Sequence, residues 1–464
     1  DRLLAELSAH AGDDMLRARA AYWRAEAVGL RQSGPAVARD ILESARGDLT
    51  DPQARSIIDG ELLMLRAYSL PQPGGALDEA LRLANDDTAP DEARLQAALV
   101  ALLLAVWLGR PSVAYEMADR AQRLIETAGP MVRYGQVRLC SLPAVAMTYD
   151  GRLPEAVEQL DQNYHRALQP PLDRNAVTNT GHNLAQALAI NGRLDDAVEV
   201  IRETLSLVSV VAVSAVVIAA QAHNHSLLRR ALTMVDEASY GPPYPPTAEA
   251  WVPMARAWEA WINGDPATAA ELAVGAGARA LEYGSPFVAA WAYHHAIEFG
   301  HPQSAAEPLS EIADRTTAVA YDTWARHAVA LTDGDTDRLE SIADEYRDRQ
   351  EYLHAVQAYV QASHLHHTQD RDHAAARAIA KAKQTAAITG QLDVWLPPDL
   401  PTHLTARETE IATLAAADLT SRDIADRLFI SIRTVDNHLA SVYTKLGIHH
   451  RSELAGILTP TRHT

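Results

Sequence analysis

The sequence predicts an all-α protein, in which a right-handed α-solenoid is followed by a small four-helix domain that contains a helix-turn-helix. Two observations lead to this prediction. Residues 1–390 show almost no strand pattern and instead repeat a pair of apolar helices. Residues 404–464 show four short helical patterns, with a tight turn between the second and the third. A Pro-rich segment, residues 391–403, joins the two regions as an extended, semi-stiff spacer.

Each repeat of the solenoid is marked by a small residue that is followed five positions later by alanine. Glycine at the first position ends one helix in a left-handed conformation, and the alanine lets the next helix pack closely. Because one helix pair cannot bury its own apolar face, neighbouring pairs stack. The pattern resembles tetratricopeptide repeats in degenerate form. The marked pairs lie 34 to 42 residues apart and are Gly75/Ala80, Gly109/Ala114, Gly151/Ala156, Gly192/Ala197, Ser226/Ala231, Gly264/Ala269, Gly300/Ala305, Gln369/Ala374 and a weaker Gly334/Leu339.

One segment interrupts the array. Tyr240–Thr247 has the sequence YGPPYPPT, and its four prolines exclude a helix. We therefore expect a hinge or bend at residues 240–247, between two parts of the solenoid.

Aromatic residues are concentrated within two repeats that follow this segment. Trp251, Trp258 and Trp261 recur at helical spacing on one stripe. Interhelical core is the favoured interpretation of this stripe. The alternative is an aromatic-lined pocket for a small effector or a peptide. The residues that would line such a pocket are Trp251, Trp258, Trp261, Trp291, Tyr293 and Trp324.

The sequence lacks the patterns that are typical of metalloproteins, enzymes and membrane proteins. The histidines at 364, 366, 367 and 373 do not converge as metal ligands, so we expect no metal site. No P-loop, Gly-x-Ser-x-Gly elbow or His-Glu-x-x-His pattern occurs, so we expect neither an enzyme nor a bound cofactor. The longest apolar run, residues 210–220, is too short to cross a bilayer. We therefore expect no membrane partner. The single cysteine, Cys140, excludes a disulfide within the chain, so we expect the protein in the reducing cytoplasm.

Charge is unevenly divided along the chain. The chain has 41 Lys and Arg against 60 Asp and Glu, a net charge of −19. Residues 403–464 hold seven basic and seven acidic residues, so the remainder carries the whole −19. The acidic N-terminal region should repel nucleic acid, so we expect nucleic acid to bind the C-terminal domain. Because a neutral domain binds DNA weakly as one copy, we expect a homodimer or a higher oligomer.

The third helix of the C-terminal domain carries the strongest functional signal. Its apolar stripe is Val435, Leu439, Val442 and Leu446, at i, i+4, i+7 and i+11. If this stripe faces inward, the opposite face is mostly small or polar. That outer face consists of Arg433, Asn437, Ala440, Ser441 and Thr444.

Such a face suits the major groove of double-stranded DNA. Arg433 matches the two acceptors of guanine, Asn437 can bond adenine in bidentate fashion, and Asp436 can accept from cytosine. Thr434, His438 and Lys445 lie on a flank that suits phosphate oxygens. The complete set of predicted DNA-binding residues is Thr420, Ser431, Arg433, Thr434, Asp436, Asn437, His438, Ala440, Ser441, Thr444 and Lys445.

These residues resemble the LuxR-type (NarL/FixJ-type) DNA-binding domain of bacterial regulators. The match runs through Leu404, Thr405, Arg407, Glu408, Glu410, Ile411, Ile424, Ala425, Leu428, Ile430, Ser431, Thr434, Val435, His438, Leu439, Lys445 to Ile448, and Arg451. The resemblance implies that the third helix binds the groove, and that Leu454 and Leu458 of the fourth helix pair two domains. Asp418 stands where this family usually has Gly, and Asp436 where it usually has Lys or Arg.

Helical repeats followed by such a domain resemble the large ATP-binding regulators of the same family. In those proteins a nucleotide-binding domain precedes the repeats, and an inducer with ATP drives self-association on promoters. The present chain begins at Asp1 and lacks that domain. It is either a fragment or a short form, and an upstream ATPase domain is one expected partner.

We therefore expect a transcription regulator, and an activator rather than a repressor, that binds promoter DNA and works with RNA polymerase. The solenoid would sense a small-molecule or protein effector and would hold the DNA-binding domain back until the signal arrives. The alternative is a repeat scaffold for protein partners, with a vestigial or dimerising C-terminal domain.

Overall fold

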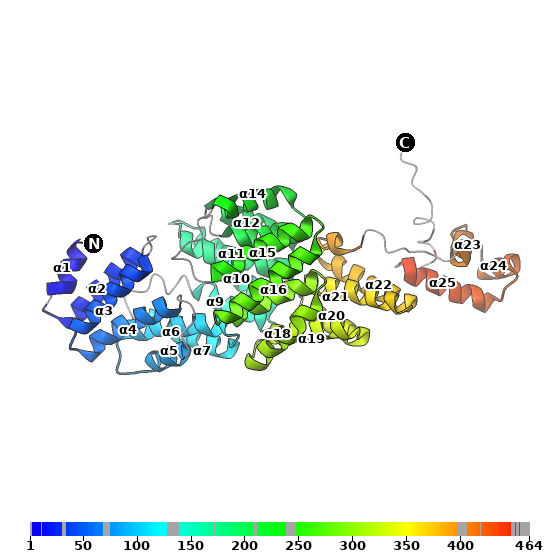
Figure 1. Ribbon diagram of the computed structural model, residues 1–464. Helices are drawn as coiled ribbons and strands as arrows, with labels where there is room; N and C mark the ends of the chain where they lie inside the picture. Colours follow the sequence, from blue (N-terminus) through cyan, green and yellow to red (C-terminus); the bar gives the residue numbers. More distant parts are fainter. Residues whose placement is uncertain are drawn as a thin grey trace. The chain divides into compact units, whose positions relative to one another are not determined.

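The computed structural model describes residues 2–10, 12–29, 34–67, 75–127, 139–170, 172–207, 211–237, 247–397, 406–417, 419–446, 451 and 454. Within these ranges the secondary structure is helical, with no strand (Figure 1). None of the described helices combines the length and the apolar character needed to cross a membrane. The chain divides into two compact units, residues 1–332 and 333–464, and each unit is treated by itself below.

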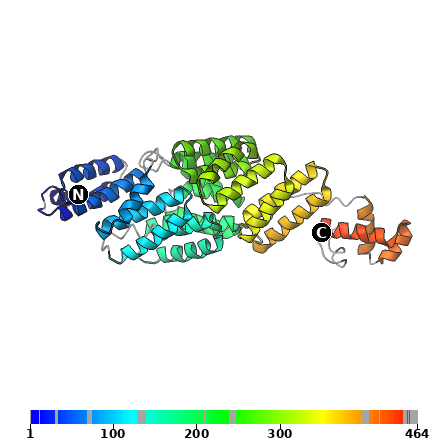
Figure 2. The same ribbon diagram turned by 90° about the horizontal axis from the view of Figure 1, so that it is seen from below.

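The first unit is an α-solenoid. Most of its helices pack against the next helix along the chain, and several also pack against the one after that, as stacked helix pairs do (Figure 2). The solenoid prediction is therefore confirmed. Its helices are α1 (Arg2–His10), α2 (Asp14–Gly29), α3 (Gly34–Asp48), α4 (Pro52–Ala67), α5 (Ala76–Ala84), α6 (Asp91–Trp107), α7 (Pro111–Ile125), α9 (Leu142–Tyr149), α10 (Leu153–Ala167), α11 (Arg174–Ile190), α12 (Leu194–Leu207), α13 (Ala212–Gln221), α14 (His225–Glu237), α15 (Thr247–Ile262), α16 (Pro266–Glu282), α17 (Pro286–Glu298), α18 (Pro302–Arg315) and α19 (Val319–Asp333).

The marked glycines adopt the conformation expected of them. Each lies at positive φ, between 63° and 87°, and the residue five positions later is wholly buried. Each of these glycines except Gly75 lies one or two residues after the end of a described helix. The buried residue is alanine in every pair but Gly334/Leu339, and the small alanine lets the next helix pack closely. The confirmed pairs are Gly75/Ala80, Gly109/Ala114, Gly151/Ala156, Gly192/Ala197, Gly264/Ala269, Gly300/Ala305 and Gly334/Leu339.

Two predicted pairs are out of register. Ser226 lies inside α14, and the left-handed residue is His223, with φ 51°. Asp370, with φ 57°, takes the place predicted for Gln369. Both turns use non-glycine residues, which the left-handed region admits less readily but does not exclude. The hinge predicted at residues 240–247 lies outside the described residues, apart from Thr247 at the start of α15.

The first unit also contains a contact between distant parts of the chain. The amide of Thr317, between α18 and α19, donates a hydrogen bond of 2.9 Å to the carbonyl of Gly109, which is 208 residues earlier. Nearby, the ring of Tyr149 lies edge-on to those of Phe287 and Trp324, at centroid distances of 5.0 and 5.9 Å. The turn between α6 and α7 is therefore fixed to repeats much later in the array.

Gly109→Ala is expected to destabilise the first unit more than Gly264→Ala. Both glycines are left-handed, with φ 63° and 82°, so both substitutions cost about 1–2 kcal/mol of backbone strain. A Cβ on Gly109 would also lie 2.7 Å from Cε2 of Tyr321, whereas a Cβ on Gly264 meets nothing within 4 Å. Overpacking should add about 1–3 kcal/mol at Gly109 alone. Denaturant unfolding of the two variants measures the difference in the free energy of unfolding. Equal losses of stability would show that the packing around Gly109 adjusts to the added Cβ without an energetic penalty.

The second unit begins with the last helices of the array. These are α20 (Thr336–Asp348), α21 (Tyr352–Thr368) and α22 (Asp372–Thr389), and α21 packs against both of the others. Gly390, with φ 68°, ends α22, and the 3-10 helix η3 (Asp393–Trp395) follows. Leu392 between them is wholly buried, whereas Trp395 is half-buried.

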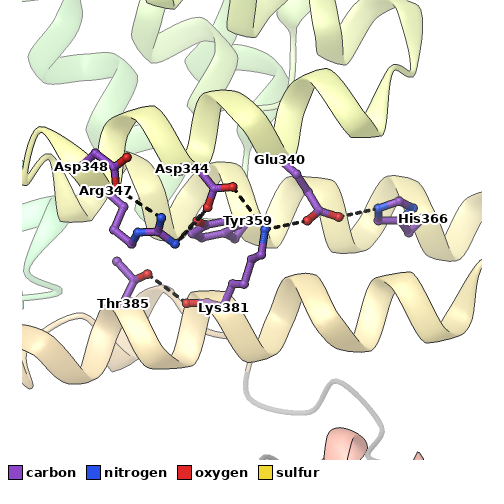
Figure 3. Close-up of polar contacts among 8 residues, drawn as sticks. All are labelled: Glu340, Asp344, Arg347, Asp348, Tyr359, His366, Lys381 and Thr385. Atoms are coloured by element: carbon purple, nitrogen blue, oxygen red, sulfur yellow. Dashed lines mark hydrogen bonds and ion pairs between the residues drawn. The ribbon is translucent and has the colours of Figure 1, made fainter.

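A network of charges joins these three helices (Figure 3). Lys381 Nζ of α22 donates to Glu340 Oε2 at 3.0 Å and to Asp344 Oδ2 at 3.3 Å, both on α20. From α21, His366 Nε2 lies 3.0 Å from Glu340 Oε1, and the hydroxyl of Tyr359 donates to Asp344. The buried His366 thus has a structural partner, and the network links α20, α21 and α22 to one another.

Replacing Lys381 by methionine is expected to weaken this end of the array by about 1 kcal/mol at neutral pH, as for part-exposed ion pairs. Burial alone would raise the pKa values of Glu340 and Asp344, but hydrogen bonds from Lys381, His366 and Tyr359 outweigh it and lower both. Because these pKa values are lower in the folded state, their stabilisation is present at neutral pH and is lost as pH falls through the folded values.

Guanidinium unfolding between about pH 3 and pH 7 measures this dependence. In the methionine variant, the stability should fall less steeply with acid, since the cation that depressed the carboxyl pKa values is gone. Lys383→Met is the matched control, because Lys383 is on the same helix and exposed. A control variant that loses as much stability as Lys381→Met would contradict the role of the network.

Candidate nucleic-acid interface

Three described helices build the C-terminal domain: α23 (Ala406–Ala416), α24 (Ser421–Leu428) and α25 (Ile432–Leu446). Their apolar stripes meet in one core, so the predicted inward face of α25 is confirmed for the described side chains. The expected fourth helix lies outside the described residues, apart from positions 451 and 454. The buried core residues are Ile411, Ala412, Ala415, Ile424, Ala425, Val435, Leu439, Val442 and Leu454.

Side-chain caps fix where the two helices of the helix-turn-helix begin. The amide of Asp423 donates to the Thr420 hydroxyl at 3.2 Å, and the amide of Thr420 donates to the Asp423 carboxylate at 3.0 Å. Hydrogen bonds from the Thr420 hydroxyl and amide hold the pKa of Asp423 below its ordinary value. Ser431 accepts from the amide of Thr434 at 3.1 Å and caps α25.

The outer face of α25 is open to solvent. Arg433, Asp436, Asn437 and Ala440 are exposed, on the side opposite the core. Thr434 and His438 are half-buried along the flank, as expected of residues that border this face. The side chains of Thr444 and Lys445 lie outside the described part of the domain. Thr420 and Ser431, which were predicted to bind DNA, serve as helix caps.

Ser441 has a different environment from the one predicted. It is half-buried, and its hydroxyl donates to Glu408 Oε1 of α23 at 2.6 Å. Glu408 is only 4% exposed, and a buried carboxylate needs hydrogen-bond donors. The Ser441 hydroxyl therefore ties α25 to α23 and does not belong to the open face.

The position of Leu454 also corrects a prediction. The family resemblance places this residue at a contact between two domains, but its side chain is 0% exposed and packs in the domain's own core. A side chain that is enclosed within one domain cannot pair with another. Leu458, the second predicted contact, lies outside the described residues.

Two arginines of the domain support its backbone. Arg407 donates to the carbonyl of Leu428 at 2.9 Å, and Arg451 donates to the carbonyl of Leu419. Leu428 ends α24, where carbonyl groups lack partners within the helix. Two of the basic residues in the LuxR-like motif thus hold the chain around α24.

Sequence reasoning missed two residues near the open face. Phe429 forms the turn between α24 and α25 and is 96% exposed, and Ile432, the first residue of α25, is 42% exposed. The short turn between the two helices is the feature of the sequence that could have indicated this exposure, because a residue within it has no helix to pack against.

The aromatic residues that were considered for an effector pocket pack against one another in the first unit. Trp258 is wholly buried and lies edge-on to Trp261, at a centroid distance of 5.4 Å. The rings of Trp251 and Trp291 stack at 4.8 Å. Trp324 and Tyr293 are buried as well. Interhelical core accounts for these contacts, and a pocket interpretation is not needed.

A hollow of about 340 Å³ lies on the N-terminal repeats, between α3, α4 and α5. Arg46 Nε donates to Asp59 at 2.5 Å and Arg66 donates to Glu79 at 2.9 Å, so opposite charges alternate around it. Its volume is at the lower end of the range for small-molecule sites. The charged residues that line it are Arg39, Glu43, Arg46, Asp59, Arg66 and Glu79.

Comparison with known proteins matches the C-terminal domain to one family. The model of "Bacterial regulatory proteins, luxR family" matches residues 402–458. The spore germination protein GerE of Bacillus subtilis is 46% identical over 50 residues, which are 11% of this chain and 68% of that protein. The oxygen regulatory protein NreC of Staphylococcus aureus is 41% identical over 51 residues, 11% of this chain and 24% of that protein.

Longer relatives match over the same part. A putative HTH-type transcriptional regulator of Mycobacterium tuberculosis, Rv0890c, is 47% identical over 51 residues, 11% of this chain. The matched segment spans only 6% of that relative's length. Among solved structures, a Rap protein complexed with competence and sporulation factor aligns with a TM-score of 0.48 and 12% identity, over 82% of this chain and 99% of that one.

Proposed function

Because the chain belongs, through its C-terminal domain, to the luxR family of bacterial regulatory proteins and is a transcription regulator, we propose that it activates transcription by binding promoter DNA through the outer face of α25. The observation that carries the proposal is the exposure of Arg433 and Asn437, four residues apart, on a helix whose opposite side is buried. A helix that is held in this way can enter the major groove with both side chains directed at base edges.

The polar residues of this face define which bases it would bind. Arg433 would bond guanine and Asn437 adenine, each in bidentate fashion. Asp436 lies beside them and would accept from cytosine, while its charge keeps phosphate away. The side chain of Lys445, which the sequence predicts on the flank that suits phosphate oxygens, would add a phosphate contact.

We also propose that the protein acts as a homodimer or a larger assembly in the cytoplasm, together with RNA polymerase. The neutral charge of residues 403–464 supports this, since one copy would gain little from phosphate attraction. With Leu454 in the core, Leu458 is the remaining predicted contact between two domains.

The repeats would receive the signal, from a small-molecule or protein effector or from an upstream ATPase domain. The rest of the chain carries the net charge of −19, which supports inhibition of DNA binding by the repeats before the signal arrives. An acidic surface competes with DNA for the basic side chains of the C-terminal domain.

Two measurements test this proposal. Genome-wide footprinting with the full chain should reveal discrete promoter sites, and a chain that protects no DNA would contradict the function. At one such site, residues 404–464 alone, which have their own core, should bind more tightly than the full chain. Equal affinities would contradict the inhibition by the repeats but would leave DNA binding intact.

The alternative function is a repeat scaffold that binds protein partners. Helix pairs of this kind present extended surfaces, so the fold alone is compatible with it. A scaffold that binds only proteins does not require side chains on α25 that can form hydrogen bonds with bases. Substitution of Arg433 and Asn437, described in the Discussion, distinguishes the two.

A further inference from the structure

Phe429 is the most exposed large apolar side chain among the described residues, at 96%. Ile432, three residues later, is also exposed, at 42%. The other large apolar residues of α25 that are described pack into the domain core. Single exposed apolar side chains are common on protein surfaces, so the backbone and the position of Phe429 must indicate whether it has a role.

The backbone of Phe429 adds a second, independent anomaly. Its φ and ψ are 56° and 42°, in the left-handed region that bulky residues seldom adopt. The cost is about 1–2 kcal/mol, and glycine or asparagine would close the same turn more cheaply. The amide of Ile430 donates to the carbonyl of Ala425 at 3.1 Å and fixes this turn. A strained and exposed residue is a candidate for a contact with another molecule.

The position of the two residues indicates which molecule. Ile432, Asp436 and Ala440 are spaced at i, i+4 and i+8 on α25 and are all exposed, so they form one row that runs from the turn before α25 towards its outer face. Phe429 lies in the turn that leads into this row. The apolar pair is thus continuous with the DNA-binding face at the N-terminal end of α25, the end that contacts base edges in helix-turn-helix proteins.

We propose that Phe429 and Ile432 contact the methyl groups of thymine and make thymine the preferred base at one end of each half-site. Thymine alone among the four bases presents a methyl group in the major groove, and an aromatic or aliphatic side chain is its natural partner. Backbone phosphates offer no such apolar surface. This inference rests on the proposed DNA-binding function and assigns part of its sequence preference.

A cycle of one protein substitution and one base substitution tests the contact. Phe429→Asn removes the ring and keeps a residue that tolerates the left-handed turn. In a duplex that carries a footprinted site, each thymine of one half-site is replaced in turn by uracil, which lacks only the methyl group. Fluorescence anisotropy with the full chain measures affinity. At the contacted position, uracil should weaken wild-type binding about fourfold, the factor expected for one methyl group.

The asparagine variant should bind the thymine and uracil duplexes equally, and as weakly as the wild type binds uracil. Ile388→Asn, an exposed apolar residue on α22, is the matched control and should keep the full difference. Thermal melting of both variants reports on folding.

Three results would overturn the inference, and they have different meanings. If uracil changes nothing in the wild-type protein, the thymine contact does not exist although DNA binding stands. If Phe429→Asn leaves affinity intact but lowers transcription in vitro, the ring contacts a protein instead. If the wild-type chain binds no duplex at all, it is the proposed function itself that fails.

Discussion

Replacing Arg433 and Asn437 together by alanine is expected to remove the sequence preference of the protein. Each bidentate base contact contributes about 1–3 kcal/mol of discrimination, so the specific site should lose about 2–6 kcal/mol of binding free energy. Binding to unrelated DNA should change little, since it depends on phosphate contacts. Both side chains are exposed, and the helix below them is anchored by Val435 and Leu439, so the fold should survive.

Anisotropy titrations with a specific and a scrambled duplex, at one fixed salt concentration, measure this loss. Arg427→Ala is the matched control, because it removes an exposed arginine of α24, outside the recognition helix. It should weaken both duplexes slightly and equally. If the double variant retains the specific preference, α25 does not read the site, and the scaffold alternative gains support.

Trp258→Ala is expected to have the largest effect on stability. The ring is wholly buried, edge-on to Trp261 and to Phe299, with centroid distances of 5.4 and 5.1 Å. Removing such a side chain leaves a cavity and costs about 3–5 kcal/mol. In a solenoid the loss falls mainly on the repeat concerned and its neighbours.

Hydrogen–deuterium exchange of peptides from α15 and α17 should therefore accelerate strongly, while peptides from the C-terminal domain stay unchanged. Leu172→Ala is the control, because Leu172 is exposed and its truncation leaves no cavity. A variant with unaltered exchange would show that the aromatic residues are not core, and would revive the pocket interpretation.

Local sequence rules predicted the features that neighbours along the chain decide. The Gly264/Ala269 spacing is such a case, because a left-handed turn and the close packing after it involve two consecutive helices. The same rules placed the left-handed turn one residue too early, at Gln369 instead of Asp370, because a non-glycine residue in this conformation is hard to identify from the sequence. The inward stripe of α25 was likewise visible in its period.

Tertiary partners decided what the sequence could not reveal. Ser441 lies at the edge between the two faces of α25, and only the buried Glu408 opposite it draws its hydroxyl inward. Leu454 has the character of an interface residue as much as of a core residue until the other helices surround it. Phe429 contradicts the usual placement of aromatic residues, and such local contradictions are expected at functional sites.

The hydrogen bond between Thr317 and Gly109 has a consequence for how the first unit folds. A linear repeat array has low contact order, and its end repeats can open independently of the rest. Here a loop of some 200 residues must close before the contact can form, which carries an entropic cost that local pairs avoid. Once closed, the repeats between the two positions can no longer unravel one at a time, and they should open together in a single cooperative event.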